Sequence, residues 1–453
     1  MKVHRSQRTF IGASVGTILV AVVTMLSSTA PASGGNLPAQ LRSPATSHAL
    51  PMTTTAPVNQ FTFGMTHTQH SADAWGDPTA VSSARSIAKS LGGFQDQAIM
   101  GWGVTNPEPA PGVFDFTDLD RRVAFMRSSG ATPVITLAGA PDWMKGGRAG
   151  ETDWSKIEVA PTVAHYADFA ALAAKIARRY PDVVHFMVWN ELKGFFDQAN
   201  NRWDAYHYTA LYNAVYDALK AVNPAIAVGG PYVVMDSWTS AGVASNPSNV
   251  SGLWGVLDQR PLDVVTYWLA HAHGADFVAI DAASGPRDAP ASVDPAVATE
   301  KFAAVDAWLR ARTRLPIWWA EFYVQPRGAS WTRQHQASVQ LFALLQMQRS
   351  GAAAAFLWQP EASASSELGA VWTQTATLGG GKRLPFGSGV AALERVLAPA
   401  GSAAQVTIDT RRGIATIVGS SGLWLAVNAG GAAQTVTTPS GSVTLGSRLF
   451  TAG

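Results

Sequence analysis

The sequence predicts a (β/α)8 TIM barrel followed by a small C-terminal β module. Over residues 60–400, short apolar runs alternate with long amphipathic stretches, and eight strand–helix units can be counted, the number that a TIM barrel needs. Over residues 401–453, short runs rich in Thr, Val and Ile alternate with Gly/Ser turns, which is typical of a small β-sandwich-like module packed on the barrel. The chain has 453 residues, 47% of them hydrophobic, so it can bury a core of this size.

The eight expected strands are short apolar runs bounded by turn residues or by helical patterns. They are residues 61–65, 97–102, 132–137, 183–189, 225–229, 264–268, 317–320 and 354–358. An open doubly wound sheet is the alternative arrangement of such units, but no Gly-rich phosphate-binding turn follows the first strand.

Apolar residues at spacings of three and four predict the helices between these strands. The clearest case has Tyr166, Phe169, Ala173 and Ile176 on one face. One expected helix begins at its cap, Thr117, and is closed by Gly130. The other expected helices are residues 81–91, 166–180, 206–222, 295–312, 332–349 and 389–397. No helix is assigned after the fifth strand, because residues 236–258 are Ser/Gly-rich and poorly patterned.

The N-terminus is typical of a signal peptide, which we expect over residues 1–32. Lys2, Arg5 and Arg8 precede an apolar stretch over residues 9–26, and Ala30-Pro31-Ala32 offers a cleavage site. An uncleaved membrane anchor is the minor alternative, although Gly and Ser residues dilute the apolar stretch. Residues 33–59, rich in Pro, Ser, Thr, Ala and Gly, are expected to form a flexible linker. The protein is therefore expected to be secreted, with no membrane association after cleavage.

Charge and cysteine content exclude several functions. The formal net charge of +2 becomes −1 when residues 1–32 are removed, because they contain three basic residues and no acidic one. We therefore expect no nucleic-acid partner. The chain has no cysteine, which excludes thiol chemistry and Cys-ligated metal. The oligomeric state cannot be inferred from these features.

Two glutamates occupy the positions where barrel enzymes place catalytic groups, at the C-terminal ends of strands. Glu191 follows the expected fourth strand in Trp189-Asn190-Glu191, and Glu321 follows the expected seventh in Trp319-Ala320-Glu321. Glycosidic bond cleavage needs one carboxylic acid to protonate the leaving oxygen and one carboxylate across the anomeric carbon. The pair therefore predicts glycoside hydrolysis, and double displacement requires the two carboxyl groups to lie ~5–5.5 Å apart.

Several segments resemble known glycosidases. Trp189-Asn190-Glu191 resembles the Asn-Glu motif of clan A glycoside hydrolases, and Trp319-Ala320-Glu321-Phe322 resembles the nucleophile strand of that clan. Residues 106–116, with sequence NPEPAPGVFDF, and residues 132–137, with sequence TPVITL, resemble glycoside hydrolase family 39 and its β-xylosidase relatives. The resemblance covers most of residues 60–400.

The resemblance implies a retaining O-glycosyl hydrolase without a cofactor, acting on a xylan-like or cell-wall polysaccharide or oligosaccharide. It implies Glu191 as acid/base, Glu321 as nucleophile and Asn190 as the hydrogen-bond partner of the sugar 2-hydroxyl. It further implies that Tyr267 donates to the nucleophile and that Trp358, with Trp143 as a weaker candidate, stacks on sugar. The Arg that usually ends the second strand of this clan is missing here, and Trp268 stands where family 39 often has His.

Two rival functions remain open. His271-Ala272-His273, with His67 and His70 after the first strand, allows a metal-dependent hydrolase, although such histidines also hydrogen-bond substrate. We therefore keep His67 and His271 as substrate-binding candidates and expect no metal. A non-catalytic carbohydrate-binding barrel is the other rival, which the missing Arg favours and the two retained acids oppose. Lys193, two residues after Glu191, could contact substrate.

Overall fold

The computed structural model describes residues 54–58, 61–68, 71–73, 75–289, 293–324, 330–363, 369–398 and 404–453. The expected signal peptide and most of the expected linker lie outside these ranges. Among the described residues, no helix combines the length and the apolar character that a membrane span requires.

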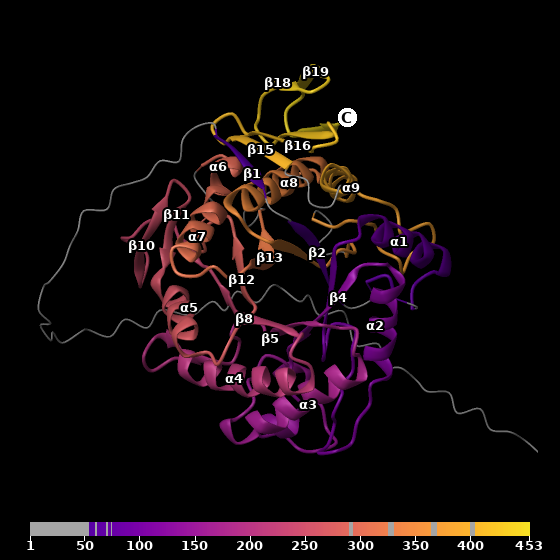
Figure 1. The fold of residues 1–453 in the computed structure, drawn as a ribbon, viewed down its shortest axis with the longest axis vertical. Coiled ribbons are helices and arrows are strands. Elements are labelled where there is room, and N and C mark those ends of the chain that lie inside the picture. The colour runs from indigo at the N-terminus through magenta and orange to yellow at the C-terminus, as the bar shows by residue number, and fades with distance from the viewer. Residues whose placement is uncertain are drawn as a thin grey trace, which may run out of the picture. The chain divides into compact units, whose positions relative to one another are not determined.

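Eight parallel strands close into a barrel, which confirms the predicted TIM barrel (Figure 1). Each strand pairs with the next one of the barrel in chain order, and β14 pairs with β2 to close the ring. The barrel strands are β2 (Thr62–His67), β3 (Phe94–Ala98), β4 (Thr132–Leu137), β5 (His185–Val188), β8 (Ala227–Val234), β12 (Phe277–Ala283), β13 (Ile317–Tyr323) and β14 (Ala354–Trp358).

Helices follow the strands and cover the outside of the barrel. They are α1 (Pro78–Leu91), α2 (Thr117–Ser128), α3 (Tyr166–Arg179), α4 (Ala205–Val222), α5 (Gln259–His271), α6 (Pro295–Ala298), α7 (Glu300–Arg310), α8 (Arg333–Ser350) and α9 (Pro385–Leu397). Three short 3₁₀ turns lie between β4 and α3, namely η1 (Asp142–Lys145), η2 (Trp154–Lys156) and η3 (Val163–His165).

Side-chain caps explain where several of these helices begin. Asp77 accepts a hydrogen bond from the Ala80 amide at the start of α1, and Thr332 does the same for His335 at the start of α8. The expected cap of α2 is wrong, because Thr117 is the first helical residue and Phe116 occupies the cap position without a side-chain bond.

The predicted sixth strand is wrong. Residues 264–268 lie inside α5, and the sixth barrel strand is β12, which the sequence analysis missed. Asp258 caps α5 by accepting from the Arg260 amide, and Pro261, Val265 and Trp268 are buried at helical spacing. A five-residue apolar run fits a strand and one turn and a half of a buried helix equally well.

The poorly patterned segment before α5 forms a small three-stranded sheet outside the barrel. Its strands are β9 (Ser237–Trp238), β10 (Pro247–Gly252) and β11 (Gly255–Asp258). A second small hairpin, made of β6 (Phe196–Asp197) and β7 (Arg202–Trp203), follows β5.

The C-terminal strands form a five-stranded sheet and a separate hairpin, as the β module predicts. The sheet order is β1-β15-β16-β17-β20, and β18 pairs with β19. Its strands are β15 (Ala404–Asp409), β16 (Ile414–Val418), β17 (Trp424–Asn428), β18 (Gln434–Thr438), β19 (Gly441–Leu445) and β20 (Leu449–Ala452). Strand β1 (Thr54–Val58) pairs antiparallel with β15, so these five residues of the expected linker belong to the sheet.

Helix α8 lies between the barrel and this sheet. It contacts β14 on one side and β15, β16 and β17 on the other. Its side chains from His335 to Gln348 are all buried, polar ones included. A helix that is buried all round has no single apolar face, so α8 shows no strong amphipathic pattern.

Aromatic side chains fill the lower interior of the barrel. Trp318 stacks on Phe277 with ring centroids 3.9 Å apart, and Phe94 and Phe356 pack against the same indole. This packing leaves the polar chemistry at the C-terminal ends of the strands.

Two register shifts lie just above this layer. The pairing of β12 with β8 passes over Tyr232, and the pairing of β12 with β13 passes over Ala320. Such bulges re-aim side chains next to active sites. Here they bring Tyr232, Asp281 and Glu321 to one end of the barrel.

Candidate active site

The candidate active site is a small pocket at the C-terminal ends of the barrel strands. Side chains from seven barrel strands, or from the residues that follow them, line it. They are Thr66, His67, Asp96, Ala98, Trp102, Thr136, Ala138, Asn190, Tyr232, Glu321 and Trp358. Four of the predicted site residues, Asn190, Glu321, Trp358 and His67, are among them.

Glu191 sits on a strained turn directly after β5. Trp189, Glu191 and Leu192 all have positive φ, at 69°, 49° and 50°. Non-glycine residues adopt this conformation at a cost and keep it where the surroundings hold them. The Trp189 indole donates to the carbonyl of Lys193 at 2.7 Å, and the Lys193 amide donates to the carbonyl of Asn190 at 3.0 Å. These bonds fix the direction of the Glu191 side chain.

Lys193 is the direct partner of Glu191. Its Nζ lies 2.8 Å from Oε2 of Glu191 and 2.8 Å from Oε1 of Glu158, a residue of the loop between β4 and α3. The Lys193 side chain is 32% exposed and that of Glu191 is 20% exposed, so the pair is only partly open to solvent. Lys193 thus joins the loop to the acid.

Glu321 is 5% exposed and is held by two tyrosines. The Tyr232 hydroxyl donates to Oε1 at 2.6 Å, and the Tyr323 hydroxyl donates to Oε2. Two phenolic donors stabilise the carboxylate form and fix both of its oxygens. Neither tyrosine was predicted. Their only sequence signal is that each lies in a largely apolar run near the end of a strand.

A third carboxyl group, that of Asp281, completes the cluster and was also missed. Asp281 is 1% exposed and pairs in register with Glu321 across β12 and β13. One oxygen from each of Glu191, Asp281 and Glu321 lies within 4.8 Å of the others. Asp281 follows a short apolar run, as the two predicted acids do, but the misplaced sixth strand hid this signal.

The pKa values of the three acids respond to burial and to each other. Burial and the charge of Glu191 raise the pKa of Glu321 to about 7, although the two tyrosine hydroxyls oppose this shift. Burial works to raise the pKa of Glu191, but Lys193, together with Asp281 and the charge of Arg287, outweighs burial and holds that pKa below its usual value. Burial, with the charges of Glu321 and Glu191, raises the pKa of Asp281 well above its usual value.

A further buried acid, Asp96, lies on β3 at the pocket. Both of its carboxylate oxygens accept from the Thr136 hydroxyl at 2.9 Å, and burial raises its pKa to about 7. Trp102 follows the same strand with φ of 45° and also lines the pocket. The region where clan A enzymes usually carry an Arg therefore presents a carboxyl group and an indole.

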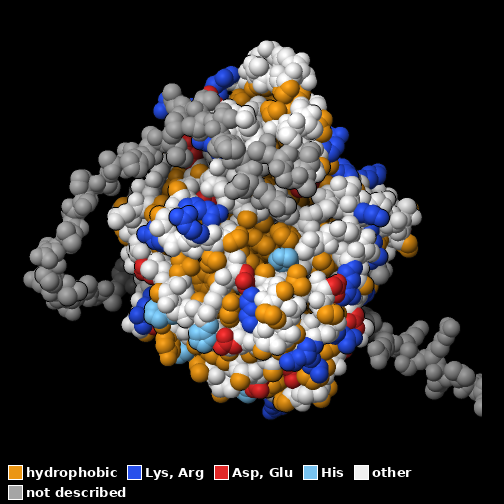
Figure 2. Space-filling model, in the orientation of Figure 1, with side chains coloured by type: hydrophobic (Ala, Val, Ile, Leu, Met, Phe, Trp, Pro, Cys, Tyr) orange, Lys and Arg blue, Asp and Glu red, His pale blue; other side chains and the backbone are white. Residues whose placement is uncertain are grey.

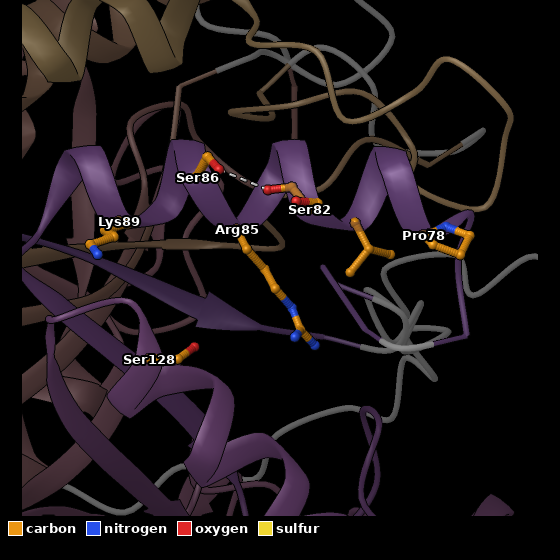
Figure 3. A pocket seen from close by; sticks show the side chains of 7 residues that line it. Pro78, Ser82, Arg85, Ser86, Lys89 and Ser128 are labelled. Atoms are coloured by element: carbon orange, nitrogen blue, oxygen red, sulfur yellow. Dashed lines mark hydrogen bonds between the residues drawn. The ribbon is translucent and has the colours of Figure 1, made fainter.

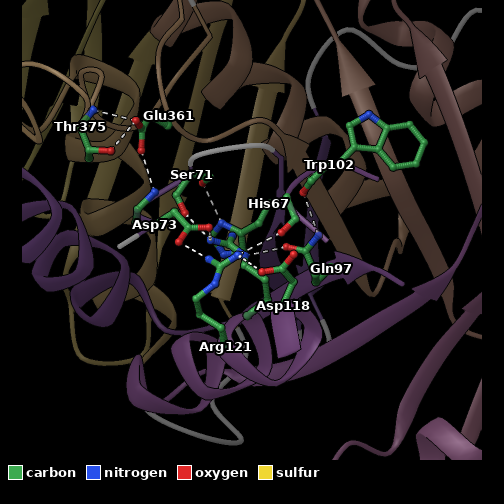
Figure 4. A network of polar contacts seen from close by, with 12 residues as sticks. His67, Ser71, Asp73, Gln97, Trp102, Asp118, Arg121, Glu361 and Thr375 are labelled. Carbon is green, nitrogen blue, oxygen red and sulfur yellow. Dashed lines mark hydrogen bonds and ion pairs between the residues drawn. The ribbon is translucent and has the colours of Figure 1, made fainter. Parts of the chain in front are cut away.

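His67 reaches the pocket edge but is tied into a buried polar network (Figure 4). Its Nδ1 lies 2.9 Å from the Ser71 hydroxyl, and its Nε2 lies 3.1 Å from Oε1 of Gln95. Burial, together with the charge of Arg122, lowers its pKa well below the usual value. Both ring nitrogens are engaged, so the structure favours a supporting role over direct contact with substrate.

Three predicted site residues lie elsewhere. Tyr267 and His271 are on α5, outside the barrel, where their rings stack with centroids 4.0 Å apart. Tyr232 and Tyr323 donate to Glu321 in place of Tyr267, because residues 264–268 form a helix and not a strand. Trp143 is in η1, and its indole donates to the carbonyl of Glu108 at 2.9 Å. It does not line the pocket.

The histidines of the metal hypothesis do not converge. His271 Nδ1 lies 2.8 Å from the Tyr267 carbonyl, and His273 Nδ1 lies 2.8 Å from the carboxylate of Asp217. His70 lies outside the described residues. Within the described ranges, the group with a spacing that could hold a metal ion is Glu191, Asp281 and Glu321. Tyrosine hydroxyls and Lys193 already engage two of these three acids.

A hollow of about 440 Å³ lies along α1, where Arg85, Lys89 and Ser128 border it (Figure 3). It is on the outer helical layer, away from the three acids. On the face drawn in Figure 2, hydrophobic side chains gather near the centre, and basic and acidic side chains are scattered around them.

Comparison with known sequences gives one family match. Residues 104–257 match the family described as glycosyl hydrolases family 39. The matched segment starts after β3, ends in β11 and contains Glu191. The chain resembles that family, as the motifs predicted. No curated protein sequence matches the chain.

Solved structures share the fold. A monomeric β-xylosidase from Caulobacter crescentus CB15 has a TM-score of 0.55 at 16% identity, over 82% of this chain and 74% of that one. A family 39 glycoside hydrolase from Bacteroides cellulosilyticus WH2 has a TM-score of 0.56 at 14% identity, over 86% and 80%. A glucosidase from Croceicoccus marinus has a TM-score of 0.54 at 16% identity, over 86% and 81%.

Proposed function

We propose that this protein is a retaining glycoside hydrolase with Glu191 as acid/base and Glu321 as nucleophile. The family match and the glycosidase neighbours support a glycoside hydrolase. The observation that carries the mechanism is the spacing of the two acids, whose nearest carboxyl oxygens lie within 4.8 Å. Retaining enzymes hold the two carboxyl groups at ~5–5.5 Å, and inverting enzymes at ~6.5–9.5 Å to admit a water molecule.

In the first step, Glu321 attacks the anomeric carbon while Glu191 gives a proton to the leaving oxygen. A glycosyl ester forms at Glu321 and the glycosidic C–O bond breaks. In the second step, Glu191 takes a proton from water, the water oxygen bonds to the anomeric carbon and the ester C–O bond breaks. Tyr232 and Tyr323 would fix the Glu321 carboxylate during both steps.

Substrate contacts are assigned from the pocket lining. Asn190 and Trp358 line the pocket, which supports contacts with the sugar whose bond is cleaved, by hydrogen bonding and by stacking. We infer a xylan-like or other cell-wall glycan as substrate, because one structural neighbour is described as a β-xylosidase. The basic, apolar N-terminus supports export to where such glycans occur.

The test uses Glu191→Ala and Glu321→Ala on a panel of aryl glycosides and cell-wall polysaccharides. Each variant should lose on the order of 10²-fold or more in kcat/KM on the glycoside that the wild type cleaves. Azide should rescue Glu321→Ala in part and give the glycosyl azide of inverted configuration. Glu394→Ala is the matched control, since Glu394 is a half-buried acid on α9 that does not line the pocket.

Four outcomes would contradict the proposal. Wild-type activity in either acid variant would remove the assignment, and an inverted product from the wild type would make Glu321 a base for water. Glycan binding without turnover, insensitive to Glu321→Gln, would indicate the carbohydrate-binding rival. Metal analysis of the purified protein would show stoichiometric metal only for the metal-dependent rival.

A further inference from the structure

The contact with Lys193 favours the ionised form of Glu191, whereas an acid catalyst needs a proton. Lys193 lies 2.8 Å from the Glu191 carboxylate and stabilises the ionised form. Protonation of the leaving oxygen therefore requires a nearby donor that supplies Glu191 with a proton when substrate is bound. Asp281 is the group in the right place.

Two buried carboxyl groups a few ångströms apart favour the state with one proton between them, because like charges so close make it costly to ionise both. One oxygen of Asp281 lies within 4.8 Å of an oxygen of Glu191. Lys193 fixes the ionised state on Glu191, so the proton of this pair belongs to Asp281. The pair titrates as a unit, with the proton moving between its two members.

The surroundings of Asp281 favour its neutral form. It is 1% exposed, and its Oδ2 has no hydrogen-bond partner among the described residues. An ionised oxygen buried without a donor is costly, whereas a neutral carboxyl group tolerates the site. Asp281 also pairs in register with the second acid, Glu321.

No cation neutralises Asp281 directly in the described part of the site. Lys301 Nζ donates to the Ser237 hydroxyl at 2.9 Å and to the Ala283 carbonyl at 2.8 Å. Arg287 donates to Asp236 at 2.7 Å. Besides Lys301, the titratable groups that act on Asp281 are Glu191, Glu321, Asp236, Tyr232 and Tyr323.

We propose that Asp281 is the proton reservoir of Glu191, an inference that rests on the proposed function. When the leaving oxygen draws a proton from Glu191, the O–H bond of Asp281 breaks and its proton passes to Glu191. When water attacks the glycosyl ester, Glu191 takes the water proton and returns one to Asp281. Over one turnover Asp281 gives up one proton and regains one, so the relay needs no other reactant. Asp281 acts through Glu191 and is a positioning residue, not a group that touches the substrate.

The test compares Asp281→Asn on aryl glycosides with good and poor leaving groups. A dinitrophenyl leaving group needs no acid, so its rate of glycosylation should fall by less than about threefold. A phenyl or alkyl leaving group should lose on the order of 10²-fold in kcat/KM. The alkaline limb of the pH–rate profile on the poor substrates should move to lower pH. Without the Asp281 proton this limb reports Glu191 alone, and Lys193 favours the ionised form of that acid.

Asp306→Asn is the matched control. Asp306 is a fully buried acid on α7 whose carboxylate accepts from the Trp319 indole at 3.0 Å, outside the barrel mouth. Burial raises its pKa to about 7. The Asp306→Asn variant should change the stability of the protein. Any change in its kcat/KM should be the same for good and poor leaving groups. Asp281→Glu, which keeps a carboxyl group, should recover part of the activity on poor substrates and serves if Asp281→Asn fails to fold.

A second readout does not depend on turnover. The infrared difference between wild type and Asp281→Asn at neutral pH should show the carbonyl band of a protonated carboxylic acid, while Asp96, Asp306 and Glu394 cancel. An equal loss on all leaving groups, or a missing band, would overturn the relay. Dinitrophenyl glycoside activity that survives Glu321→Ala would instead overturn the proposed function.

Discussion

The Tyr232 hydroxyl donates a 2.6 Å hydrogen bond to Oε1 of Glu321, across 89 residues of sequence. Tyr232 is fully buried at the bulge of β8, with φ of 47°. A residue with a strained backbone on one strand thus donates a hydrogen bond to a carboxylate on another strand. Such strain is typical of residues that the surrounding structure holds in place for function. Three predictions follow from contacts of this kind.

Tyr232→Phe should lower kcat roughly 10- to 100-fold, because a buried hydrogen bond to a charged group contributes about 1.5–3 kcal/mol. The lost donor had lowered the pKa of Glu321, so the variant raises it. Activity needs ionised Glu321, and the acidic limb of the pH profile should therefore move to higher pH. Tyr267→Phe on α5 is the matched control and should leave the profile unchanged. An unshifted acidic limb in Tyr232→Phe would contradict this role.

Lys193→Met should raise the pKa of Glu191, because Lys193 is the charge that holds it low. The protonated acid then persists to higher pH, and the alkaline limb of kcat/KM should move upward. Lys220→Met is the control, since Lys220 makes a similar ion pair with Asp276 at 2.9 Å away from the site. Both variants are compared by pH–rate profiles on the same aryl glycoside. A limb that stays fixed, or moves in both variants, would refute the electrostatic role of Lys193.

Arg122→Met should destabilise the fold by about 3 kcal/mol, since it removes the cation from a buried network. Arg122 is 1% exposed and donates to Gln97 at 2.9 Å and to the Ser71 carbonyl at 2.8 Å. Burial lowers its pKa to about 10, although the charge of Asp73 opposes this shift.

Arg127→Met is the control for that variant, because Arg127 pairs with Asp182 at the exposed surface and such pairs contribute less than about 1 kcal/mol. Urea unfolding measured for both variants gives the comparison. Equal losses of stability in the two would show that the network around Arg122 adds nothing beyond a surface ion pair.

The local hydrophobic pattern of the sequence was enough to predict the barrel and to single out Glu191 and Glu321. The runs that end at Trp189 and Ala320 are apolar enough to be recognised as buried strands, and an acid directly after such a run is conspicuous. Strands 132–137 and 354–358 were predicted with their observed bounds. The sixth strand failed because the run Val264–Trp268 is too short to separate a strand from a buried helix by spacing alone.

That single misplacement carried Tyr267 and His271 into the predicted site and kept Asp281 out of it. A barrel prediction places a residue by its strand, so a wrong strand moves every side chain on it. Tyr232 was missed for a different reason. Its role depends on a bulge between two strands that are far apart in sequence, and no local spacing encodes that pairing.

The sequence by itself determined the barrel architecture and the two strand ends that Glu191 and Glu321 follow. It could do so because burial imposes a hydrophobic periodicity on each segment. Only the tertiary structure decided what surrounds those acids: Lys193 beside Glu191, two tyrosines on Glu321 and Asp281 between them. The ionisation state of each acid depends on charges and donors brought together from different strands. Hydrophobic patterning specifies that the strands meet but not the register at which their side chains touch.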